Sequence, residues 1–210
     1  MNGITAKKSG RVLLYIFLIA TGAAFLAPII IVLYNSFKGK LYISDDPFAL
    51  PNAETFSGIE NYIGGIEKTG FPSAFGWSLF ITVFSVAAIV LFASMTAWYI
   101  VRVKNKFTKA LYYIFVFSMI VPFQMVMFTM TKTVADLGLD KPWGLIIVYL
   151  GFGAGLAVFM FCGFVKSVPL EIEEAAMIDG CSPLQTFFYV VFPIMKPTAI
   201  TVAILDAMWI

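Results

Sequence analysis

The stretch EIEEAAMIDGCSPLQTFFYVVFP, residues 171–193, decides the fold, because it separates two apolar runs of membrane type. It is acidic and patterned like a pair of helices. Crossing a bilayer does not require acidic side chains in such a connection. We therefore interpret the stretch as a docking surface for a soluble partner. The alternative is a solvated connecting loop, and the local pattern alone favours neither.

The first half of this stretch predicts a short helix with a defined end. Pro169 suits a first helical turn, where its missing N–H leaves no hydrogen bond unmade. Ile172, Ala175, Ala176 and Met177 supply its apolar side. Asp179-Gly180 predicts the end of the helix, since glycine adopts the left-handed conformation that closes helices.

The second half predicts another helix. Ser182 is expected to cap it, with Pro183 opening the helix and Gln185 at the capping-box position. Pro193 and Pro197 are expected to break this helix before the next membrane span, because proline disrupts a helix interior.

The composition places the chain in a membrane. Hydrophobic residues make up 60% of it, charged residues 12%, and the mean hydropathy is +0.92. The net charge of +2 is too small to indicate a nucleic-acid partner. There is no histidine, and Cys162 and Cys181 have no further ligands nearby, so no metal site is expected.

The apolar runs predict one all-α membrane domain over residues 1–210. A span needs roughly 20 apolar residues, and the last run of 14 residues reaches only about 21 Å of a roughly 30 Å core. The chain is therefore expected to be truncated inside a membrane helix. The predicted spans are about 12–34, 77–101, 110–131, 143–165 and, incomplete, 197–210.

Lysine and arginine residues near the span ends set the expected orientation. Basic residues precede the first span and crowd the link between the second and third, so both places are expected in the cytoplasm. The segments 35–76 and 132–142 are expected outside. By parity, the loop 166–196 is cytoplasmic, as is the N-terminus. The basic residues concerned are Lys7, Lys8, Arg11, Arg102, Lys104, Lys106 and Lys109.

The acidic stretch also resembles a known signature. The EAA motif of ABC importer permeases reads E-A-A, three residues, G, nine residues, I-x-L-P, and this chain has Val and Phe in place of Ile and Leu. Pro122-Phe123-Gln124 and Leu137-Gly138-Leu139 resemble the carbohydrate-uptake class. The chain is thus similar to the smaller permease of maltose-type importers. The matched residues are Glu174, Ala175, Ala176, Gly180, Val190, Phe192 and Pro193.

The resemblance implies a type I ABC importer transmembrane domain, with about five of its six helices present. It implies that the loop 166–196 is a coupling helix seated in a cleft of a cytoplasmic ATPase. Glu174 would face an ATPase arginine, Ala175 and Ala176 would allow close contact, and Gly180 would make the rigid turn. Further coupling candidates are Glu171, Glu173, Asp179 and Pro193, and for the first three a solvated charge is the alternative.

The resemblance also implies the partners. They are a second permease forming a heterodimer, two cytoplasmic ABC ATPase subunits and an extracellular sugar-binding protein, all at a bacterial plasma membrane. The ATPase subunits would bind ATP and magnesium, and this chain would need no cofactor. It has no Walker motif. Gly151-x-Gly153-x-Gly155 lies in a predicted span, where Gly151 and Gly155 are spaced for helix packing.

Polar residues inside the bilayer are candidates for the substrate path. Gln124 follows Pro122 in the third span, and Asp206 lies inside the fifth. Both could hydrogen-bond a sugar, and the alternative is that both satisfy helix–helix contacts. The aromatic or apolar walls would come from Phe123, Met125 and Trp209.

Three other functions compete with that of a sugar permease. A membrane enzyme would need a nucleophile, metal cluster or paired acids, and the external pair Asp45-Asp46 lacks supporting groups. A self-contained channel or secondary transporter would not need the acidic coupling loop. An ABC permease for a polyol, a glycerol phosphate or an osmolyte remains the alternative to a sugar permease.

Overall fold

The computed structural model describes residues 8–210. The chain forms two compact units, which meet within one long helix at residues 74 and 75. All regular elements in the described residues are helices, apart from one isolated antiparallel bridge between Lys38 and Phe56. This confirms the predicted all-α class.

The first unit holds α1 (Lys8–Asn35), α2 (Lys40–Asp45) and α3 (Glu60–Thr69). Side-chain hydrogen bonds to backbone carbonyls hold the loops after α1 together. The Lys38 ammonium donates to the Asp46 carbonyl at 2.9 Å, and the Asn61 amide donates to the Lys38 carbonyl at 2.6 Å. Gly70, with φ of +60°, ends α3 in the left-handed conformation.

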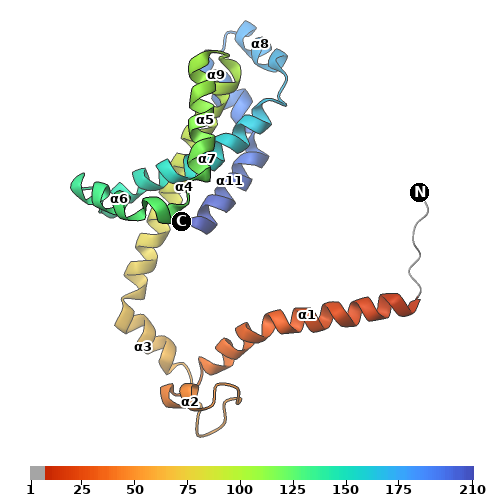
Figure 1. Ribbon diagram of the computed structural model, residues 1–210, viewed down its shortest axis with the longest axis vertical. Helices are drawn as coiled ribbons and strands as arrows, with labels where there is room; N and C mark the ends of the chain where they lie inside the picture. Colours follow the sequence, from red (N-terminus) through yellow and green to blue (C-terminus); the bar gives the residue numbers. More distant parts are fainter. Residues whose placement is uncertain (1–7) are drawn as a thin grey trace. The chain divides into compact units, whose positions relative to one another are not determined.

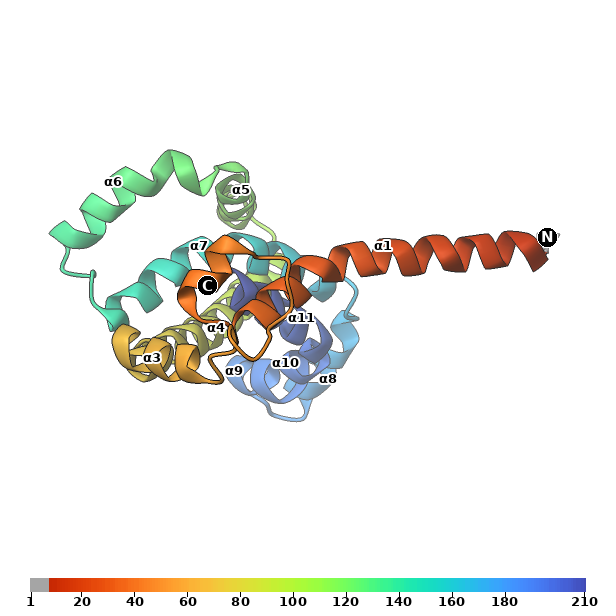
Figure 2. The ribbon, with the colours of Figure 1, turned by 90° about the horizontal axis from the view of Figure 1, so that it is seen from below.

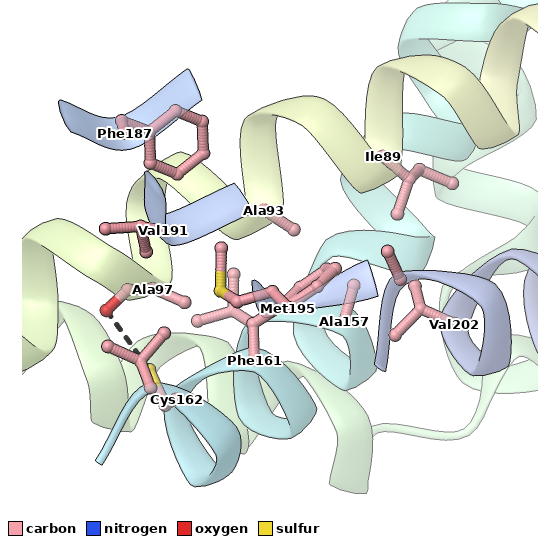
Figure 3. Packing of buried hydrophobic residues seen from close by; sticks show 13 residues of the cluster. Ile89, Ala93, Ala97, Ala157, Phe161, Cys162, Phe187, Val191, Met195 and Val202 are labelled. Atoms are coloured by element: carbon pink, nitrogen blue, oxygen red, sulfur yellow. Dashed lines mark hydrogen bonds between the residues drawn. The ribbon is translucent and has the colours of Figure 1, made fainter. Parts of the chain in front are cut away.

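The second unit is a helical bundle with one contiguous core. In Figure 3, Phe187 and Val191 face Ala93 and Ala97 of α4, with Met195 close by. Figure 1 shows α8 at one end of this unit. Its elements are α4 (Phe71–Arg102, shared with the first unit), α5 (Lys106–Ile120), α6 (Phe123–Asp136), α7 (Pro142–Val165), α8 (Leu170–Ile178), α9 (Pro183–Thr186), the π-helix η1 (Phe187–Val191), α10 (Phe192–Ile194) and α11 (Lys196–Trp209).

Three described helices are long and apolar enough to cross a membrane, namely α1, α4 and α7. The predicted third span is divided into α5 and α6, which meet at an angle of 104°. Val121 is extended there, because the ring of Pro122 disfavours helical geometry in the preceding residue. Figure 2 shows α6 leading away from the bundle.

The predicted break before the last span is present, but it lies after Ile194 rather than at Pro193. The helix passes Pro193 and bends after Ile194, where α9–α10 and α11 meet at 76°. The turn before Pro193 is a π-helix, in which the N–H of Phe192 bonds to the carbonyl of Phe187. This wider turn accommodates a residue that lacks an N–H and would crowd the carbonyl four positions earlier. Pro197, as predicted, lies at the start of the last span.

Of the two α7 glycines predicted to pack closely, Gly151 and Gly155, only Gly155 does so. A Cβ on Gly155 would lie 2.5 Å from Ser118 Oγ and 3.0 Å from the Phe115 carbonyl, so α7 touches α5 there. A Cβ on Gly151 would meet open space, so that prediction is wrong. Gly153 is the second close contact, against Ile89.

Candidate functional site

The predicted coupling stretch folds locally as its sequence indicates. Pro169 precedes α8, and Gly180, with φ of +91°, ends it. The next helix begins with a capping box. Ser182 N donates to Gln185 Oε1 at 2.8 Å, and Gln185 N donates to Ser182 Oγ at 3.4 Å. These short-range contacts make α8 and α9 a defined helical elbow.

One face of α8 is anchored to α4. Glu173 is 1% exposed, and its Oε1 accepts hydrogen bonds from Arg102 Nε at 2.9 Å and Nη2 at 2.6 Å. Its Oε2 accepts from Trp98 Nε1 at 2.9 Å. Arg102 also donates to the Val168 carbonyl at 3.0 Å. These charge-assisted hydrogen bonds fix α8 on the end of α4.

The opposite face of α8 is exposed to solvent. Glu171, Glu174, Ala175 and Ile178 occupy positions i, i+3, i+4 and i+7 of one helical stripe, and all four are exposed. Ile178 is 84% exposed and adds a large apolar side chain to this surface. We call these four residues the outer stripe of α8. It combines two carboxylates with a small and a large apolar group.

The structure therefore separates the predicted coupling residues. Glu174, Ala175, Asp179 and Gly180 are exposed, as a docking surface requires. Glu173, a coupling candidate with a solvated charge as the alternative, is buried beside Ala176, so the solvated alternative is wrong for it. The sequence offered one indication that Glu173 is buried: it lies three residues before Ala176, on the same side of the helix. Pro193 is exposed but lies in α10 rather than on α8.

The sequence did not single out Ile178, Arg102 or Trp98 for this site. A lone apolar residue before Asp179 has no distinctive pattern. Arg102 was interpreted only as a marker of the cytoplasmic side. Its contact with Glu173 joins residues 71 positions apart, which local patterns cannot reveal.

A second candidate site surrounds Asp206. A cavity of about 490 Å³ lies between the α5–α6 junction, α7 and α11. Asp206 lines it, is 4% exposed, and has no hydrogen-bond partner at Oδ2 within the described residues. Gly153 lets α11 approach closely, because a Cβ there would lie 3.3 Å from Asp206 Oδ1. An unpaired buried carboxylate is a strong hydrogen-bond acceptor.

Aromatic rings form one wall of this cavity. Phe152 lies between Phe123, at 5.5 Å between ring centroids, and Trp209, at 6.1 Å. These three residues also line an adjoining cavity of about 340 Å³, which Gln124 lines as well. The structure thus brings Asp206, Pro122, Phe123 and Trp209 to one cavity and Gln124 to its neighbour.

The chemistry of the second site suits binding rather than catalysis. A carboxylate and a glutamine can hydrogen-bond hydroxyl groups, and ring faces can cover apolar C–H surfaces. Met125, expected as a wall, lines neither cavity and is strongly exposed. Among residues 8–210, no group of three metal-binding side chains is present.

Known proteins are similar to this chain in sequence and fold over much of its length. Residues 89–210 match a family profile described as "Binding-protein-dependent transport system inner membrane component". This region includes both candidate sites.

Individual relatives extend the similarity over most of the chain. A probable starch degradation products transport system permease of Thermoanaerobacterium thermosulfurigenes, AmyC, is 39% identical over 88% of this chain and 66% of its own length. The multiple sugar-binding transport system permease MsmG of Streptococcus mutans is 35% identical over 93% of this chain and 70% of its own. The chain thus spans about two thirds of these relatives.

A solved structure shares the fold. It is a bacterial ABC transporter involved in the import of the acidic polysaccharide alginate, and its matching chain superposes with a TM-score of 0.74. The match covers 98% of this chain and 73% of the other, at 21% sequence identity. The expected fold of an ABC importer transmembrane domain is therefore confirmed.

Proposed function

Because the chain belongs to the family of binding-protein-dependent transport inner-membrane components, we propose that it is the multi-pass permease subunit of an ATP-driven sugar importer. It forms part of the translocation path and carries no ATPase site. The names of the relatives, which refer to starch products and to multiple sugars, support a sugar as the substrate.

The outer stripe of α8 is the observation that carries the proposed coupling. Its two carboxylates and Ile178 point away from the bundle, while Glu173 fixes the opposite face to α4. A helix that binds a partner on one side and is fixed on the other can transmit the partner's movement to a membrane helix. Glu174 is the candidate partner for a basic ATPase residue, and Ala175 permits close approach.

The proposed assembly has several further parts. Two ABC ATPase subunits bind ATP and magnesium and dock on the α8 elbows. A second permease completes the path in a heterodimer, and an extracellular binding protein delivers the sugar near residues 35–76. The basic residues around the α4–α5 link support a cytoplasmic N-terminus. No cofactor is assigned to this chain.

Crosslinking from Cys181 tests the coupling proposal. Cys181 follows Gly180 and is partly exposed, whereas Cys162 is buried, so a thiol-directed crosslinker distinguishes them. In native membranes, Cys181 should capture a nucleotide-hydrolysing subunit. Cys181→Ser should abolish the product. If repeated experiments capture no ATPase and uptake does not depend on ATP, the chain would instead be a secondary transporter.

The cavity at Asp206 supports an uncharged substrate. A buried carboxylate without a partner attracts hydroxyl donors and repels phosphate. The ring faces of Phe123, Phe152 and Trp209 can cover the apolar face of a pyranose. We therefore favour a neutral sugar over a glycerol phosphate, while a neutral polyol or osmolyte remains the second candidate.

A competition panel tests this preference. Uptake of a labelled sugar by the assembled transporter should be inhibited by neutral oligosaccharides and not by glycerol phosphate. Thermal shifts of the associated binding protein with the same panel would identify the ligand that is delivered. Inhibition by glycerol phosphate alone would overturn the preference for a sugar.

A further inference from the structure

A third cavity lies apart from Asp206 and shares Arg102 with the first candidate site. It measures about 780 Å³ and lies between the end of α4, the start of α5 and the end of α7. Five of its lining residues are basic, and none is Asp or Glu. They are Arg102, Lys104, Lys106, Lys109 and Lys166.

Most of this positive charge is uncompensated. Within residues 8–210, the ion pair of Arg102 with Glu173 is the one salt bridge, so the four lysines have no carboxylate partner. Lys166, from the end of α7, lies over the ring of Tyr112 of α5, 5.4 Å from the ring centroid. This contact places the Lys166 ammonium against α5, and Lys104, Lys106 and Lys109 line the same cavity.

The start of α5 adds to the same electrostatic imbalance. Its first turn has no acidic residue, and Lys106 and Lys109 lie there. The N-terminus of a helix carries partial positive charge, so lysines in the first turn are unfavourable unless an anion is nearby. The capping box between Asn105 and Thr108 supplies hydrogen bonds but no negative charge. An anion in the cavity would stabilise this arrangement.

Apart from the basic residues, the polar Asn105 and Thr108 line the cavity, and the rest of the lining is largely apolar. Ile100, Val101, Tyr112 and Cys162 line the cavity beneath the basic residues. These residues belong to α4, α5 and α7, which are apolar helices of a membrane protein. A small soluble anion would neutralise the lysines but leave this apolar surface uncovered. A ligand with an anionic head and an apolar tail satisfies both parts.

We propose that this cavity binds an anionic phospholipid, with its phosphate among Lys104, Lys109 and Lys166 and its acyl chains along Val101 and Tyr112. Basic pockets between membrane helices provide this kind of headgroup site. Arg102, which also holds α8 through Glu173, lines the same cavity. Under the proposed orientation, the lipid belongs to the cytoplasmic leaflet.

Lipid retention by the assembled transporter tests the proposal. The purified complex is placed in phosphatidylcholine nanodiscs with or without phosphatidylglycerol, and retained lipids are counted by native mass spectrometry. The complex should retain phosphatidylglycerol in preference to phosphatidylcholine. Equal retention of both lipids would overturn the proposal without any variant.

Variants then locate the site. Lys109→Gln combined with Lys166→Gln should weaken phosphatidylglycerol binding roughly 25-fold, from the contribution of each lysine near an anionic headgroup. Lys109→Arg with Lys166→Arg keeps both charges and should retain binding. Lys196→Gln, an exposed lysine at the start of α11 that does not line the cavity, is the matched control and should change little.

Two further outcomes would assign the lysines a different ligand or a different role. If inorganic phosphate displaces the bound lipid completely at equal concentration, the site recognises a small anion and the lipid proposal fails. If the lysines act only in membrane topology, the Gln variant changes the accessibility of Cys181 to an impermeant thiol reagent and leaves lipid preference unchanged. That result would also overturn the proposal, whereas the coupling role of α8 would stand.

Discussion

The side chain of Arg102, the last residue of α4, binds Glu173 in the middle of α8 through two nitrogens, with Nη2 to Oε1 at 2.6 Å. Trp98, one helical turn earlier on α4, donates to the other carboxylate oxygen. The proposed docking helix is thus attached to a membrane helix by one buried carboxylate. This contact is the proposed route by which a force on α8 would reach α4.

Removal of one partner should therefore cost stability. Glu173→Ala leaves the Arg102 guanidinium partly buried without its carboxylate, and we expect a loss of about 3 kcal/mol. A thermal unfolding series on the purified complex measures it. Glu171→Ala, an exposed residue of the same helix, should change stability by less than about 0.5 kcal/mol.

The same contact should affect coupling beyond its effect on stability. The double variant Arg102→Met with Glu173→Leu replaces the pair by apolar side chains and should regain stability relative to Glu173→Ala. If the pair transmits force, ATP hydrolysis in this variant should proceed with reduced sugar uptake per ATP. Normal uptake per ATP would show that the pair is only structural.

Glu174 should act on coupling without affecting the fold. Its side chain is exposed on the outer stripe, so Glu174→Lys should change stability by less than about 0.5 kcal/mol. Charge reversal opposite a basic ATPase residue should abolish ATP-driven uptake in membrane vesicles. The control is Asp136→Lys, at an exposed position at the end of α6. Full uptake by Glu174→Lys would reject the coupling proposal.

Gly180 should be sensitive because of its backbone. Its φ of +91° lies where L-residues are strained, so Gly180→Ala should cost about 1–3 kcal/mol or redirect the chain after α8. Gly180→Asp should also abolish coupled uptake while membrane insertion stays intact. Gly163→Ala is the matched control, because Gly163 lies in α7 with ordinary φ and open space around its Cβ position. Unchanged uptake in Gly180→Asp would contradict this role.

Two glycines of α7 offer an internal comparison of helix packing. Gly155→Ala would place a Cβ 2.5 Å from Ser118 Oγ and should destabilise the protein by about 1–3 kcal/mol. Gly151→Ala meets open space and should be neutral or stabilising by up to about 1 kcal/mol. Thermal unfolding of the two variants checks the difference, and equal effects would argue against the α5–α7 contact.

Asp206 should affect substrate affinity. Asp206→Asn keeps the size of the side chain and removes the charge, so the apparent KM for sugar should rise about 10-fold or more, as for a lost hydrogen bond to a charged group. Asp140→Asn, at an exposed position, should behave as the unchanged protein. If Asp206 instead bonds the second permease, the variant should lower assembly of the heterodimer and leave KM unchanged.

The two candidate sites could be predicted only in part from the sequence. The ends of α8 and the capping box depend on residues within four positions of one another, so the turn chemistry of Gly180, Ser182 and Gln185 predicted them. The inward direction of Glu173 depends on Arg102 and Trp98, which come from another helix. The cluster of Asp206 with Phe123 and Phe152 likewise required three separate segments to meet.

By itself, the sequence determined the membrane class, the approximate spans and the helical elbow, because hydrophobicity and capping act over short distances along the chain. The tertiary structure alone decided which carboxylate is clamped and which is free, the bend at Pro122, the π-turn that lets the helix continue past Pro193, and the cavity lined by Lys109 and Lys166. Those features arise where distant helices pack, and the energies of such contacts depend on neighbours that no local pattern contains.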